Sequence, residues 1–65
     1  MDFKLLRQNA KELCKKYKVN IYIEPKQIEI YGLTFFADLK IRNVHGQWFE
    51  VESVDKMWQI VQILV

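Results

Sequence analysis

The sequence predicts an α+β fold: a two-layer sandwich in which an antiparallel meander of three to four strands carries an N-terminal and a C-terminal helix on one face. Two periodicities point to it, because apolar residues recur every three or four positions at both ends of the chain and every second position in the middle. Sixty-five residues can bury one core and no more. We therefore expect a single domain over residues 1–65, in the order helix, strands, helix.

The first element is an amphipathic helix, roughly residues 3–17, preceded by Asp2 as its N-cap. Its apolar positions, spaced by three and four, are Phe3, Leu6, Ala10, Leu13, Cys14 and Tyr17. At about 100° per residue, a second set of side chains falls in one narrow line beside the apolar face. This basic stripe consists of Lys4, Arg7, Lys11, Lys15 and Lys18.

A first hairpin follows, because Ile21 and Ile23 alternate with polar or aromatic residues, as do Ile28 and Ile30. The stretch EPKQ between them is predicted to close it as a four-residue loop, in which the fixed φ of Pro25 favours a turn. Ile23 then pairs with Ile28 and Ile21 with Ile30, so that both strands direct their apolar side chains to one face.

The strand count depends on GLTFFA, where Gly32 either ends one strand or lies within a longer one. In the hairpin that follows, a two-residue His45-Gly46 loop would mix apolar and polar partners. A three-residue loop over 44–46, with Gly46 in the left-handed conformation, avoids this. The predicted pairs are Ile41 with Phe49, Leu39 with Val51, Arg42 with Trp48 and Lys40 with Glu50.

The chain ends in MWQIVQILV, which carries no charge and is predicted to form a helix capped by Ser53. Its β-branched residues also permit a strand. In the helical interpretation Ile63 points away from the core face and Ile60 lies on its margin, which suggests a homodimer or partner contact through this helix. Alternatively, the last turn frays and folds over the sheet edge. The apolar run is too short to span a membrane.

The uncovered sheet face is expected to collect aromatic residues with acids and two basic residues. The aromatic and basic members are Tyr22, Tyr31, Phe36, Trp48, Lys40 and Arg42, and the acids are Glu24, Glu29, Asp38, Glu50 and Glu52. Acids repel phosphate, whereas Tyr, Trp and Arg are usual anchors for a protein partner. Alternatively, these aromatics only stabilise the strands, with Arg42 stacked on Trp48.

The charge distribution adds a second possible surface. Residues 1–18 contain six Lys and Arg against two acids, and residues 19–65 contain four against six, so a +4 segment adjoins a −2 remainder. The basic stripe is thus a solvated face, a contact for nucleic acid, or a contact for an acidic protein surface.

Several chemistries lack the residues that they need. One histidine, one cysteine and two isolated glycines provide no zinc site, no disulfide and no phosphate-binding loop. Cys14 has no evident base or oxyanion donors beside it, and a catalytic pair of Cys14 with His45 would need a cleft that is hard to build from so few residues. We therefore expect no enzyme, no cofactor and no metal, and the single cysteine favours the cytoplasm.

Our hypothesis is a small non-enzymatic protein-binding module, for example an inhibitor that a phage or mobile element directs at a host nuclease or polymerase. Its expected partner-binding residues are Tyr22, Tyr31, Phe36, Arg42, Trp48, Glu50, Ile60 and Ile63. The alternative is a nucleic-acid-binding regulator that uses Lys4, Arg7, Lys11, Lys15 and Lys18. A homodimer through the C-terminal helix is compatible with either.

Overall fold

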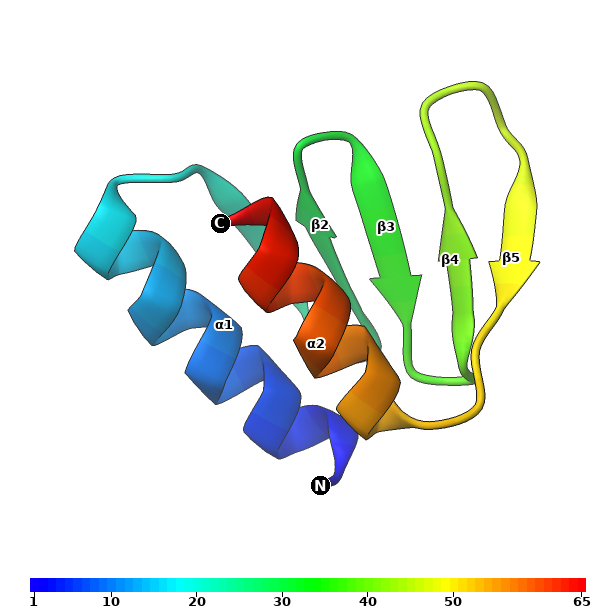
Figure 1. Ribbon diagram of the computed structural model, residues 1–65, viewed down its shortest axis with the longest axis horizontal. Helices are drawn as coiled ribbons and strands as arrows, with labels where there is room; N and C mark the ends of the chain where they lie inside the picture. The colour runs from blue at the N-terminus through cyan, green and yellow to red at the C-terminus, as the bar shows by residue number, and fades with distance from the viewer.

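The computed structural model describes residues 1–65 and has two layers, a five-stranded sheet and two helices that lie on one of its faces (Figure 1). The elements are α1 (Phe3–Tyr17), β1 (Ile21–Glu24), β2 (Gln27–Ile30), β3 (Leu33–Phe36), β4 (Lys40–Arg42), β5 (Trp48–Glu50) and α2 (Val54–Leu64). The strands form an antiparallel meander in chain order. The predicted α+β sandwich is confirmed, with five strands in the sheet.

Helix α1 covers the predicted range, and both of its ends are capped. The Asp2 carboxylate accepts a hydrogen bond from the Leu5 N–H at 2.8 Å, which satisfies one of the free donors of the first turn. At the other end Lys18 adopts the left-handed conformation (φ 58°), and the Val19 N–H bonds the Cys14 carbonyl at 2.8 Å. This is the arrangement that closes many helices, although glycine usually occupies the left-handed position.

The first hairpin has the predicted register, with Ile21 opposite Ile30 and Ile23 opposite Ile28. Its loop is tighter than we expected, because Glu24 pairs with Gln27 and only residues 25 and 26 remain unpaired. The alternation of isoleucines determines the register, and the ladder simply continues by one more pair toward the turn.

Gly32 ends a strand, which answers the question that the sequence left open. Tyr31 and Gly32 both have positive φ (52° and 80°), the signature of the two-residue turn that joins tightly twisted antiparallel strands. A side chain at position 32 would collide with Val44. A second reversal over residues 37–39 separates β3 from β4, with Leu39 at φ 67°.

The β4–β5 hairpin also has the predicted pairs, Ile41 with Phe49, Arg42 with Trp48 and Lys40 with Glu50. Gly46 has φ 80°, as predicted. The Asn43 side-chain oxygen accepts hydrogen bonds from the N–H groups of residues 45 and 47, at 2.9 and 3.1 Å. This turn is therefore stabilised by its own side chain.

The chain ends as a helix, as predicted, since the Ser53 hydroxyl caps α2 by accepting a hydrogen bond from the Lys56 N–H at 3.2 Å. The last turn does not fray, because the Val65 N–H bonds the Val61 carbonyl at 3.0 Å. One core joins both layers, and its buried members are Phe3, Leu6, Ala10, Cys14, Ile28, Ile30, Phe35, Ile41, Met57 and Val61.

The helices do not cover the whole sheet. Figure 1 shows α1 and α2 over the side that begins with β1, whereas β4 and β5 extend beyond them. Phe49 shows the consequence: it has the same facing as its buried neighbour Ile41, yet 51% of it is exposed. The helix-side face of β5 is therefore an open apolar surface.

Candidate functional site: three surfaces around the sheet

The most ordered surface group lies on the sheet face opposite the helices, where Phe36, Arg42 and Trp48 stack on one another. The ring centroids of Phe36 and Trp48 are 5.2 Å apart with the planes inclined by 36°. The guanidinium carbon of Arg42 lies 5.4 Å from each of the two centroids. We call this group the aromatic–arginine cluster. The predicted stacking of Arg42 on Trp48 is confirmed, and Phe36 joins it.

The cluster keeps its charge and much of its surface available. Arg42 belongs to neither of the two ion pairs of the molecule, so the rings alone hold its guanidinium. Trp48 is 54% exposed. An open depression of about 490 Å³ borders Phe36 and is further lined by Lys26, Ala37 and Asp38. A rigid strand pair thus presents an aromatic surface beside a hollow.

Acidic side chains surround the cluster on this face. Glu29 pairs with Thr34 next to Arg42, and Glu50 pairs with Lys40. Glu24 and Glu29 line a smaller hollow of about 160 Å³ together with Tyr22, which is 73% exposed. The face therefore combines aromatic anchors with carboxylates, a combination that repels a phosphate backbone.

Two residues lie elsewhere than the strand alternation indicated. Tyr31 occupies the β2–β3 turn with a positive φ, at the end of the sheet, because β2 stops at Ile30. Glu52 lies in the bend after β5 and not on the uncovered sheet face, because the chain leaves the ladder there to reach α2. Alternation predicts facing only as long as a strand continues.

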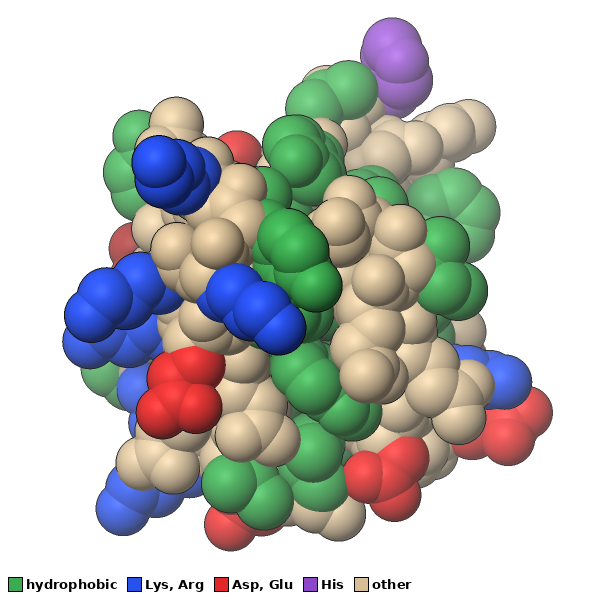
Figure 2. Space-filling model, turned by 60° about the vertical axis from the view of Figure 1, so that its left-hand side comes forward, with side chains coloured by type: hydrophobic (Ala, Val, Ile, Leu, Met, Phe, Trp, Pro, Cys, Tyr) green, Lys and Arg blue, Asp and Glu red, His purple; other side chains and the backbone are tan.

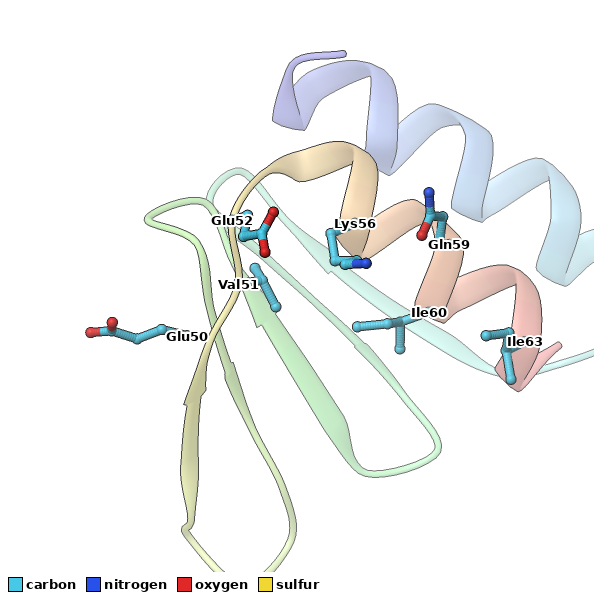
Figure 3. Close-up of a pocket in the computed structure, with 7 residues that line it drawn as sticks. All are labelled: Glu50, Val51, Glu52, Lys56, Gln59, Ile60 and Ile63. Carbon is cyan, nitrogen blue, oxygen red and sulfur yellow. The ribbon is translucent and has the colours of Figure 1, made fainter.

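A second surface is a groove of about 420 Å³ between the end of β5 and α2 (Figure 3). Val51 and Glu52 line it from the strand side, and Lys56, Gln59, Ile60 and Ile63 line it from the helix. Glu50 borders it, but its side chain points away from α2 (Figure 3). Ile63 is 84% exposed. The predicted outward orientation of Ile63 is thus confirmed, and the groove provides an apolar floor with charged rims.

The third surface is the side of α1 that carries the basic stripe, where Lys and Arg side chains gather (Figure 2). Lys4, Arg7 and Lys11 line a groove of about 300 Å³ together with Gln8 and with Ile23 of β1. The Nε atom of Arg7 is buried there without a hydrogen-bond partner. No member of the stripe takes part in an ion pair. Their positive charge is therefore not neutralised within the molecule.

The structure divides the predicted stripe. Lys18 follows the last residue of α1 in the left-handed conformation and lines a different hollow, beside Tyr22 and Tyr31. Lys15 is exposed on the helix between the two groups. Only the first three members thus converge on one groove, because the chain turns away from the helical path at Lys18.

The groups that could react are dispersed. Cys14 is fully buried in the core, and burial raises the pKa of its thiol, which disfavours the thiolate that a nucleophile needs. His45 is exposed at the tip of the β4–β5 loop. No group of three or more His, Cys, Asp or Glu side chains is placed to hold a metal ion, and neither helix is long and apolar enough to cross a membrane.

Three residues that the sequence pattern put on core-facing sides are exposed, Tyr17, Ile23 and Phe49, at 55%, 37% and 51%. Phe49 had been paired with Ile41 on the apolar face of its hairpin. The strand count could have indicated that Phe49 is exposed, because a fifth strand at about 4.8 Å spacing widens the sheet beyond what two helices at its other end cover.

No protein-family model, no curated protein and no solved structure matches the chain.

Proposed function

We propose that the protein is a non-enzymatic protein-binding module that docks through the uncovered sheet face. The observation that supports this most is the aromatic–arginine cluster. Trp48 is half-exposed and already held by Phe36 and Arg42, so it loses little side-chain freedom on binding. Trp and Arg are the residues over-represented among the few that dominate the binding energy of protein interfaces.

The chemistry of this face also describes its partner. Carboxylates beside exposed aromatic rings complement a basic surface that has apolar pockets, and nucleic-acid-binding channels of nucleases and polymerases have these properties. We therefore propose that the target is such an enzyme and that the module acts as its inhibitor, as a phage or mobile element would use it. Buried, unpaired Cys14 fits a reducing compartment, the cytoplasm.

The test compares Trp48→Ala with Val44→Ala, since both remove an exposed apolar side chain from the same hairpin, 54% and 73% exposed respectively. A protein captured from a native extract is purified and titrated by calorimetry against each variant. Trp48→Ala should weaken binding at least about tenfold, whereas Val44→Ala should leave it within about threefold. Circular dichroism checks that both variants keep the fold. Equal affinities of the wild type and the Trp48 variant would refute the proposal.

A second candidate function rests on the Arg7 groove. An unpartnered guanidinium N–H between two lysines is suited to donate a hydrogen bond to a phosphate oxygen, which supports backbone contact with nucleic acid. Fluorescence anisotropy of duplex RNA, duplex DNA and single strands, at low and near-physiological salt, tests it. Strong salt dependence that disappears in a Lys11→Glu, Lys15→Glu double variant would favour this function. Absence of binding at low salt would eliminate it.

A further inference from the structure

Strand β5 forms an open edge of the sheet. It is last in the strand order, and all three of its residues, Trp48, Phe49 and Glu50, are exposed. Natural edge strands are commonly protected by very short length, lysine, proline, a bulge or a covering element, and β5, with three residues, is short. The strand contains neither lysine nor proline, and both helices lie toward the other end of the sheet (Figure 1). This edge is therefore available for backbone pairing.

The hydrogen bonds to β4 identify which backbone groups are free. The Asn43 N–H bonds the Gln47 carbonyl, and the Val51 N–H bonds the Leu39 carbonyl, both at 3.0 Å. Hydrogen-bonded pairs alternate in an antiparallel ladder, so Ile41 and Phe49 form the hydrogen-bonded pair between these two. The N–H and C=O groups of residues 48 and 50 consequently point outward from the sheet edge.

The side chain of Phe49 adds an apolar reason for a neighbour. It faces the helix side of the sheet, where Ile41 next to it is 5% exposed and Phe49 itself is 51% exposed. Val51, two residues on, faces the same side and lines the groove of Figure 3. A strand added at this edge would cover the open side of Phe49.

We propose that a second copy of this chain pairs with β5, antiparallel, around a twofold axis at Phe49. In this register residue 48 of each copy exchanges N–H and C=O hydrogen bonds with residue 50 of the other, which uses all of the outward groups identified above. The two Phe49 side chains meet at a non-hydrogen-bonded position, where facing side chains are closest. The ten strands of the two copies then form one continuous sheet.

Charge complementarity favours a second copy over an unrelated strand. Across the sheet on the uncovered face, the row reads Lys40 and Glu50 from one copy, then Trp48 and Arg42 from the other. Each Glu50 thus lies between a lysine and a tryptophan that carries a guanidinium, and the two Glu50 side chains are only diagonal neighbours across the new strand pair. On the helix side the row is Ile41, Phe49, Phe49, Ile41, which is apolar throughout. The strand is complementary to itself on both faces.

This dimer goes beyond the protein-binding function and does not depend on it. It also differs from a dimer through Ile60 and Ile63 of α2, which the uncharged C-terminal sequence suggested. Pairing at β5 would place the aromatic–arginine clusters of the two copies next to each other on one face.

The decisive variant is Glu50→Pro, with Glu50→Ala as its control. Proline removes the outward N–H at position 50 without removing a hydrogen bond to β4, and edge strands tolerate it there. In sedimentation equilibrium from micromolar to millimolar concentration, the wild type should dimerise. Glu50→Pro should raise the dissociation constant about 30-fold or more, and Glu50→Ala should change it by less than about threefold.

A covalent test uses Phe49→Cys in a Cys14→Ala background, so that the chain has one thiol. Opposite residues at a non-hydrogen-bonded position have Cα atoms about 4.5 Å apart, within the range of a disulfide. Addition of oxidised glutathione should join two chains at position 49 and release reduced glutathione, whereas Val44→Cys in the same background should give little dimer.

Three results would overturn the proposal. The first is a wild type that stays monomeric at the highest concentration. The second is a dimer that Glu50→Pro leaves intact and Ile63→Lys dissociates, which would place the interface on α2. The third is equal crosslinking at positions 49 and 44. Retained circular dichroism and cooperative melting of Glu50→Pro establish that it remains folded.

Discussion

Lys15 and Lys18, three positions apart in sequence, should respond in opposite ways to replacement by glycine. Lys15 lies within α1, and Lys18 follows it with φ 58° and ψ 42°. Both side chains are exposed, and both place a positive charge near the C-terminus of the helix. Replacement of either by glycine therefore removes a similar charge interaction, and the backbone conformation decides the sign.

The magnitudes follow from the two conformations. A non-glycine residue in the left-handed region costs about 1–2 kcal/mol, and glycine at this position avoids that cost. Glycine also has more conformational freedom in the unfolded chain, and the larger entropy that it loses on folding offsets about 0.5–1 kcal/mol of the gain. Lys18→Gly should thus raise the free energy of unfolding by about 0.5–1 kcal/mol. Lys15→Gly should lower it by about 1 kcal/mol, the cost of glycine within a helix. The corresponding shifts in Tm are about 2–8 °C upward and about 4–8 °C downward.

Urea denaturation followed by tryptophan fluorescence, together with calorimetric melting, measures both variants. The slope of free energy against urea should stay equal to that of the wild type, since neither change alters the surface that unfolding exposes. If both variants lose the same stability, Lys18 is not held in the left-handed conformation and the proposed helix end is wrong.

Three further changes test the core, a cap and the buried thiol. Phe35→Ala empties a fully buried position and should lower the free energy of unfolding by about 3–5 kcal/mol. This is a large share of the total free energy of unfolding of a domain this size, roughly 3–10 kcal/mol. A Tm within a few degrees of the wild type would contradict the packing of Phe35. Asp2→Ala should cost about 1 kcal/mol in urea denaturation and Asp2→Asn much less, and equal losses would argue against the 2.8 Å cap. Because burial raises the folded-state pKa of Cys14, its contribution to stability is complete below about pH 8.5 and is lost as the pH rises through that raised pKa. Over this alkaline range the free energy of unfolding should therefore fall less with pH in Cys14→Ala than in the wild type. Parallel curves of stability against pH for the two proteins would show that the Cys14 thiol does not have a raised pKa.

The registers of both predicted hairpins could be predicted because one strand of each has a buried face, with Ile28 and Ile30 buried in β2 and Ile41 buried in β4. A slip by one residue would expose Ile28 and bury Glu29, so the isoleucine alternation admits one pairing. The same reasoning excluded a two-residue loop at Gly46. These features depend on neighbouring residues in sequence, which is why a single sequence sufficed.

The turns at Tyr31 and Leu39 could not be predicted from the alternation of apolar residues. Both residues have positive φ, 52° and 67°, which their residue types disfavour. The ladders on either side of each turn hold them there, since β3 pairs with β2 and β4 simultaneously. The strand count therefore emerges from the assembled sheet.

Some features of the candidate surfaces likewise follow from the sequence alone, and others depend on the tertiary structure. The sequence by itself determined the two-layer fold, the part of the basic stripe that lies on α1, the outward facing of Trp48 and Arg42, and the exposed Ile63, because each follows from a local period of about two or 3.6 residues. Only the tertiary structure decided that Phe36 completes the cluster, that Glu52 lines the groove beside α2, and that Phe49 lies uncovered on an open edge. Those outcomes depend on where the chain leaves a strand and on which strands the helices cover, and both are set by packing between elements distant in sequence.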